Sequence, residues 1–193
     1  FNIVLDAGHG GEDGGASSKD GILEKDINLS IALKLNEMFK SAGFKVVMTR
    51  DEDKSIYDDN AKTTRQKKVS DIKNRVNIIN SDPTNILISI HQNKFPESKY
   101  HGSQIFFSSN LPESRKLAES IKQSITDSLQ PENKRECKPA QKEIYILNKA
   151  QVPAVIVECG FLSNEEEAKK LVDDSYQQQI AKCIYDGFIN YIG

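Results

Sequence analysis

The chain has 193 residues, of which 37% are hydrophobic and 28% are charged, which suits one globular domain with its own core. A net charge of −2 excludes an overall basic field, so we expect no nucleic-acid partner and no electrostatic attraction to an anionic membrane. Three cysteines cannot all pair within one chain, which argues against a disulfide framework, and no apolar run is long enough for a transmembrane segment.

The first predicted strand, residues 3–6, runs into a glycine cluster at 8–11 that contains His9. Residues 10–21 are rich in glycine, serine and acids, which predicts a loop. Apolar residues then recur at helical spacing over 24–42, and a second strand is expected over 44–49. This order of strand, helix and strand predicts a parallel pair with a right-handed crossover.

The middle of the chain alternates charged and apolar segments. Residues 50–68 are charged and polar, which favours a solvated loop, and 69–80 carry a helical apolar stripe. The continuous apolar run 86–90 is typical of a strand buried on both faces, and it ends at His91. A second histidine therefore follows a predicted strand.

The C-terminal half repeats this alternation. We expect strands over 103–108, 143–147 and 154–157, a loop over 130–143, and helices over 112–129, 164–172 and 176–191. The last of these strands ends at Glu158. Strands alternating with helices predict an α/β fold with a mostly parallel sheet.

Three polar side chains thus stand at strand ends: His9, His91 and Glu158. If the strands are parallel, these side chains lie along one edge of the sheet, where ligands bind in such folds. Two histidines and one carboxylate, with an open fourth position for water, form the ligand set of a catalytic zinc ion, and a further carboxylate can shuttle protons. Glu24 could reach this edge, although Asp26 could serve equally well, and acids are favoured in the first turn of any helix.

Other interpretations of these residues are weaker. A carboxylate that ends an apolar run costs free energy unless it is paired or functional, which favours a functional Glu158. A dinucleotide-binding loop is disfavoured because Asp13 stands where G-x-G-x-x-G requires glycine. Cys159 would point to the face of its strand opposite Glu158, which favours a buried core thiol over a nucleophile.

Six stretches of the sequence resemble a known family. They are D-A-G-H-G-G (6–11), E-K-D-I-N-L (24–29), T-R (49–50), R-V-N-I-I-N (75–80), S-I-H-Q-N (89–93) and P-A-V-I-V-E-C-G-F-L-S-N (153–164). In this order they are similar to the zinc-dependent N-acetylmuramoyl-L-alanine amidases of the amidase-3 type, which hydrolyse peptidoglycan. The composition and the absence of wall-binding repeats resemble most the members that act on spore cortex during germination.

The resemblance implies roles for particular residues. It assigns His9, Glu24 and His91 to zinc, preferring Glu24 over Asp26, and it assigns Glu158 to catalysis. It places Arg135 near the substrate, and we add Asn93, close to His91 in the sequence, as a second candidate for substrate binding. It also implies one catalytic domain over 1–193, built on a twisted, mostly parallel six-stranded sheet with about six helices. Gln92 departs from the family pattern, which usually has a small residue there.

The expected activity is hydrolysis of the amide bond between muramic acid and the L-alanine of the stem peptide. A zinc peptidase acting on stem peptides and a non-catalytic peptidoglycan-binding module are the alternatives. The resemblance implies an exported protein that works outside the cytoplasm, in the cell wall or spore cortex. Because the chain starts at Phe1, almost inside a strand, we expect that a leader has been removed. A protein activator is a further expected partner.

Overall fold

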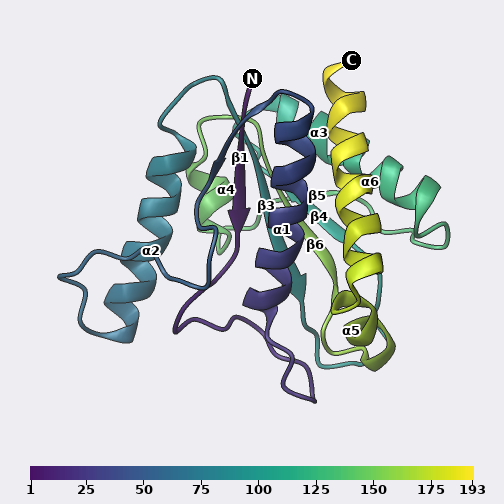
Figure 1. Cartoon of the computed structure of the whole chain (residues 1–193), viewed down its shortest axis with the longest axis horizontal. Coiled ribbons are helices and arrows are strands. Elements are labelled where there is room, and N and C mark those ends of the chain that lie inside the picture. Colours follow the sequence, from purple (N-terminus) through teal and green to yellow (C-terminus); the bar gives the residue numbers. More distant parts are fainter.

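The computed structural model describes residues 1–193 and contains one six-stranded sheet with helices on both faces (Figure 1). The strands are β1 (Asn2–Ala7), β2 (Lys45–Met48), β3 (Asn85–Asn93), β4 (Gln104–Phe107), β5 (Lys138–Pro139) and β6 (Ala154–Phe161). Their order across the sheet is β2-β1-β3-β6-β4-β5. Only the β4–β6 pair is antiparallel, which confirms the predicted mostly parallel sheet.

The helices divide between the two faces of the sheet. They are α1 (Glu24–Ser41), α2 (Thr64–Ile79), α3 (Pro112–Ser128), α4 (Tyr145–Lys149), α5 (Glu165–Leu171) and α6 (Asp174–Ile192). A core of 27 buried residues joins α1, α3, α5 and α6 to one face, and α1 and α6 lie side by side over it (Figure 1). A smaller core of nine residues lies under α2 and α4 on the other face.

Alternation along the strands decides which side chains face α2 and α4. Val4, Leu87 and Ile156 belong to the smaller core. Because successive side chains point to opposite faces, the residues two positions later, which are Asp6, Ser89 and Glu158, project to the same side. Cys159 lies on the opposite face, within the larger core, which confirms its prediction as a buried thiol. All three cysteines are free.

The predicted helix over 69–80 begins five residues earlier than expected, at Thr64. Thr63 and Gln66 form a capping box, in which each side chain accepts a hydrogen bond from the other residue's backbone. The prediction of a loop over 50–68 is therefore wrong for its last five residues. The capping signature T-x-x-Q was present in the sequence, but the charged residues around it masked the start of the helix.

The predicted strand over 143–147 is also wrong, because Tyr145–Lys149 form the short helix α4. Ile146, Leu147 and Ala150 are buried together in the smaller core, which is a helical spacing. Five residues are too few for the pattern to separate the two periods. The sixth strand is instead β5, two residues within the predicted loop over 130–143, which pair with Phe106 and Phe107. No helix is both long and apolar enough to span a membrane.

Candidate metal centre

His9 lies in a tight turn directly after β1. Its φ of 62° falls in the left-handed region, which is unfavourable for a residue with a side chain. Two buried arginines hold this turn through its carbonyl groups. Arg75 donates to the carbonyls of Ala7 and His9, and Arg50 donates to those of Ala7 and Gly8. The surrounding hydrogen bonds therefore stabilise a strained backbone that presents the His9 imidazole.

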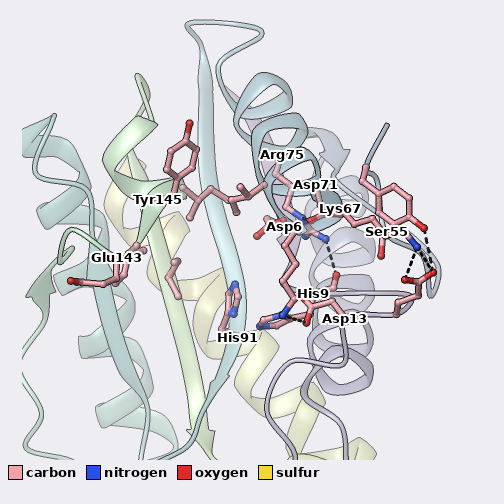
Figure 2. Close-up of a pocket in the computed structure, with 18 of the residues that line it drawn as sticks. Asp6, His9, Asp13, Ser55, Lys67, Asp71, Arg75, His91, Glu143 and Tyr145 are labelled. Atoms are coloured by element: carbon pink, nitrogen blue, oxygen red, sulfur yellow. Dashed lines mark hydrogen bonds and ion pairs between the residues drawn. The ribbon is translucent and has the colours of Figure 1, made fainter. Parts of the chain in front are cut away.

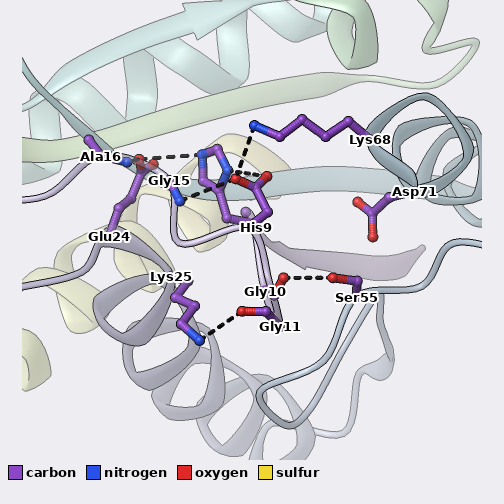
Figure 3. A network of polar contacts seen from close by, with 12 residues as sticks. His9, Gly10, Gly11, Gly15, Ala16, Glu24, Lys25, Ser55, Lys68 and Asp71 are labelled. Atoms are coloured by element: carbon purple, nitrogen blue, oxygen red, sulfur yellow. Dashed lines mark hydrogen bonds and ion pairs between the residues drawn. The ribbon is translucent and has the colours of Figure 1, made fainter. Parts of the chain in front are cut away.

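Glu24, the first residue of α1, is almost fully buried with only 3% of its surface exposed. Each carboxylate oxygen accepts a backbone N–H: Oε2 from Ala16 at 2.8 Å and Oε1 from Gln92 at 3.0 Å. The same two oxygens face the imidazoles, with Oε2 3.3 Å from Nε2 of His9 and Oε1 3.0 Å from Nδ1 of His91. The carboxylate is therefore fixed between the two histidines, and Figure 3 shows Glu24 beside His9 and Ala16.

His91 lies near the end of β3, beside the His9 turn, with the two ring centroids 5.1 Å apart. Gly8 makes this approach sterically possible, because a Cβ at position 8 would overlap the His91 ring. Gly15 serves the other side in the same way: its Cβ would lie 2.6 Å from both Glu24 Oε2 and His9 Cδ2. Small residues in the loop therefore leave the space in which the three side chains meet.

His9, Glu24 and His91 offer one ligand atom each, all within 4.8 Å of one another. Two imidazole nitrogens and a carboxylate oxygen form the donor set of a catalytic zinc site with an open position. Asp13 strengthens the fit, because its Oδ2 lies 2.8 Å from Nδ1 of His9 and leaves Nε2 facing the site. A carboxylate on the second ring nitrogen is the usual partner of a zinc-bound histidine. The side chains present therefore fit a divalent metal.

The charges of this cluster also favour a cation. Burial by itself would lower the pKa of His9, but hydrogen bonds with Asp13 and Glu24 outweigh it and raise that pKa to about 9. Burial would raise the pKa of Glu24, whereas the same imidazoles hold it far below its usual range. A proton on His9 thus offsets part of the negative charge of Asp13 and Glu24 in the metal-free protein. A metal ion can replace that proton.

We call His9, Glu24 and His91 the metal set. Glu158 lies beside it on β6, where it pairs with His91 of β3 in the parallel register. Its Oε2 is buried and has no hydrogen-bond partner. Burial raises the pKa of Glu158 to about 7, although the neighbouring histidines lower it in part. An unpartnered carboxylate oxygen beside a metal set suits a group that exchanges protons with a bound molecule.

Asp6 and Arg75 form a buried network of hydrogen bonds next to the site. Asp6 Oδ1 accepts from Arg75 and from Thr49, both at 2.7 Å, and its Oδ2 accepts from Ser89 at 2.5 Å. Burial would raise the pKa of Asp6, but Arg75 and these hydrogen bonds lower it to about 2. Arg75 also contacts Asp71 at 2.6 Å. This network connects β1, β3 and α2, and Arg75 joins it to the His9 turn.

A cleft of about 280 Å³ opens from the two histidines into the space between α2 and α4. In Figure 2, His91 lies between Glu143 and Tyr145 on one side and Asp13, Ser55 and Lys67 on the other. Lys67 is bound by Glu12 at 2.9 Å, and Lys68 lies 3.4 Å from Asp13. The metal set therefore stands at the end of a charged cleft that a substrate can enter.

Arg135 and Asn93 do not line this cleft. The Arg135 guanidinium lies over the Phe161 ring, 4.7 Å from its centroid, and donates to the His101 carbonyl. Asn93 ends β3 and accepts from the backbone N–H of Lys94 through its side chain. Their assignment to substrate stays a prediction.

Three residues that support the site were missed as such by the sequence analysis: Asp13, Arg50 and Arg75. Arg50 and Arg75 belong to two of the six stretches that resemble the family, but no role was assigned to them. Asp13 was noted only because it breaks a glycine motif. A signal existed for Asp13: a carboxylate only four residues after His9, in the same predicted loop, is close enough in sequence to contact the imidazole. No sequence signal separates a buried arginine from an exposed one.

Comparison with known proteins agrees with this geometry. Residues 3–190 match the Amidase_3 family model, described as N-acetylmuramoyl-L-alanine amidase. The chain is 35% identical to the germination-specific N-acetylmuramoyl-L-alanine amidase of Bacillus subtilis, over 98% of this chain and 78% of that protein. The CwlD amidase of Clostridioides difficile, solved in complex with the GerS lipoprotein, is 46% identical with a TM-score of 0.95, covering 99% of this chain and 98% of that one. AmiC2 of Nostoc punctiforme is 27% identical with a TM-score of 0.85, covering 100% and 97%.

Proposed function

The chain belongs to the N-acetylmuramoyl-L-alanine amidase family, and on this premise we propose that His9, Glu24 and His91 hold a catalytic zinc ion and that Glu158 is its general base. The family activity is hydrolysis of the amide bond between muramic acid and the L-alanine of the stem peptide. The observation that carries the proposal is the meeting of a His-Glu-His set with an unpartnered buried carboxylate on the adjacent strand.

Zinc in this position would supply Lewis-acid chemistry, polarising water and the scissile carbonyl. Asp13 holds the His9 ring so that Nε2 faces the site, and the Ala16 and Gln92 amides hold the Glu24 carboxylate. These contacts fix the donor atoms before a metal arrives, which reduces the ordering required on binding. The strained His9 turn is part of the same preorganisation.

Glu158 performs the proton transfers. As a carboxylate it accepts a proton from the attacking water, and it then delivers that proton to the nitrogen of the departing alanine. The alanine leaves as a free amine, the lactyl group becomes a carboxylic acid, and Glu158 is again a carboxylate. In the metal-free chain burial raises the pKa of Glu158 to about 7, and the charge of a bound zinc ion would lower it, which keeps the group a carboxylate that can accept the proton.

Glu158→Gln tests this role. The amide keeps the size of the side chain but cannot accept the proton, so we expect cleavage of purified peptidoglycan to fall by about 10² to 10⁴. Zinc content, measured by elemental analysis, should match that of the unaltered protein. Glu166→Gln, an exposed acid on α5, is the matched control and should retain activity. Near-normal turnover by Glu158→Gln would refute the assignment.

Product masses separate the amidase from the two alternatives. An amidase releases stem peptides that begin with a free L-alanine amine and leaves intact glycan strands. A zinc peptidase would instead cut within the stems, and a binding module would release neither product. Detection of cleavage within the stems by mass spectrometry would contradict the proposed bond specificity.

We further propose that the protein acts outside the cytoplasm, on spore cortex, with a protein partner. The similarity to a germination-specific amidase supports the substrate, and that to an amidase solved with a lipoprotein supports the partner. Purified cortex digested with the chain alone, and then with candidate lipoproteins, tests both points. Faster cleavage of vegetative wall than of cortex, with no effect of any partner, would contradict this setting.

A further inference from the structure

The cleft between α2 and α4 contains more charge than a metal site requires. Most of these charges are already neutralised within the chain. Arg75 is bound by Asp6 and Asp71, and Lys67 is bound by both oxygens of Glu12. Lys68 differs, because 61% of its side chain is exposed and its only ion pair is a long contact of 3.4 Å to Asp13. Of the cations that line the cleft, it is the most available to a ligand.

The position of Lys68 relative to the metal set is defined by two contacts. Its ammonium lies 3.4 Å from Oδ1 of Asp13, whose other oxygen lies 2.8 Å from Nδ1 of His9. An extended peptide advances about 3.5 Å per residue, so the second residue beyond the scissile bond lies about 7 Å away. Lys68 reaches His9 only through Asp13, so its ammonium lies outside the set of three candidate ligands. Lys68 is therefore placed for a group of the stem peptide beyond the scissile bond.

The chemistry of the substrate agrees with this placement. The N-acetylated sugars of a glycan strand are uncharged, whereas the second residue of a stem peptide is a γ-linked D-glutamate with a free α-carboxylate, or its amide, D-isoglutamine. A lysine ammonium attracts the carboxylate as an opposite charge but gains much less from the neutral amide. The cleft thus offers one available cation, Lys68, to a substrate whose first anion is this carboxylate.

We propose that Lys68 is a specificity-determining residue that binds the α-carboxylate of the second stem residue, so that the enzyme prefers stems with D-glutamate over amidated stems. The inference rests on the proposed function, because it places the scissile bond at the His9, Glu24 and His91 set. Asp13 keeps its hydrogen bond to His9 in this arrangement and gives up only the long contact with Lys68.

The test compares two peptidoglycans that differ only in amidation of the second stem residue. We expect the unaltered, zinc-loaded protein to cleave the D-glutamate form with a kcat/KM about fivefold higher, the scale of one partly exposed ion pair. Lys68→Gln should remove this preference, and Lys68→Glu should reverse it. Lys73→Gln removes the same charge from an exposed position on the same helix and should retain it.

Three results would overturn the inference. Equal cleavage of the two forms by the unaltered protein would show that the enzyme does not recognise the second stem residue. A preference retained in Lys68→Gln would show that another group binds its α-carboxylate. Equal losses on both forms, accompanied by lower zinc affinity, would show that Lys68 acts only through Asp13 and His9. Failure to cleave either form would instead contradict the proposed function itself, so the two failures are distinguishable.

Discussion

Replacing Asp13 by alanine tests whether the orientation of His9 controls metal binding. Asp13 Oδ2 lies 2.8 Å from Nδ1 of His9, on the side of the ring away from Glu24. Without this carboxylate the ring can rotate and adopt the wrong tautomer. Loss of such a partner typically weakens metal binding 10- to 100-fold, or about 1.4 to 2.7 kcal/mol.

Proton competition makes this loss depend on pH. The pKa of His9 is raised to about 9, partly by Asp13, so below that pH zinc must displace a proton from the ring. Asp13→Ala lowers that pKa, which eases the competition near pH 6.5 and offsets part of the loss. We therefore expect the ratio of the two zinc affinities to grow as the pH rises from 6.5 to 9.

Competition with a chromogenic zinc chelator at both pH values measures this ratio. The control is Glu12→Ala, in the same loop, whose carboxylate binds Lys67 and not His9, Glu24 or His91. Its zinc affinity should be unchanged. An Asp13→Ala affinity equal to that of the unaltered protein at pH 9 would refute the role of Asp13.

Two further predictions concern the charged residues around the site. The pKa of Asp6 is lowered to about 2 in the folded chain, so its stabilisation is complete above its unfolded value near 4 and is lost as the pH falls towards 2. Urea unfolding should show a loss of about 2 kcal/mol over that interval that is absent in Asp6→Asn, and parallel pH profiles of the two proteins would contradict it. Arg135→Ala should raise the KM for purified cortex, and unchanged kinetics would end its assignment to substrate.

The choice between Glu24 and Asp26 is an example of what the spacing of residues in the sequence could not predict. Both acids lie in the first turn of α1, and the spacing of the residues could not separate them. The structure separates them by burial: Glu24 points between the two histidines, whereas Asp26 is exposed. Similarly, the geometry of a strand predicted that Glu158 and Cys159 point to opposite faces, but it could not predict that Oε2 of Glu158 lacks a partner. That property depends on atoms contributed by other strands.

What the sequence determined by itself was local: the apolar runs, their periods, and the polar residues at which the strands end. Those patterns arise within a few residues, since each strand or helix buries its own face. The tertiary structure alone decided what depends on distant segments meeting. It joined Arg75 to the His9 turn, placed Lys68 beside Asp13, and made Tyr145–Lys149 a helix. The physical reason is that charge pairing, burial and strand partners are properties of neighbours in space, which the order of residues does not display.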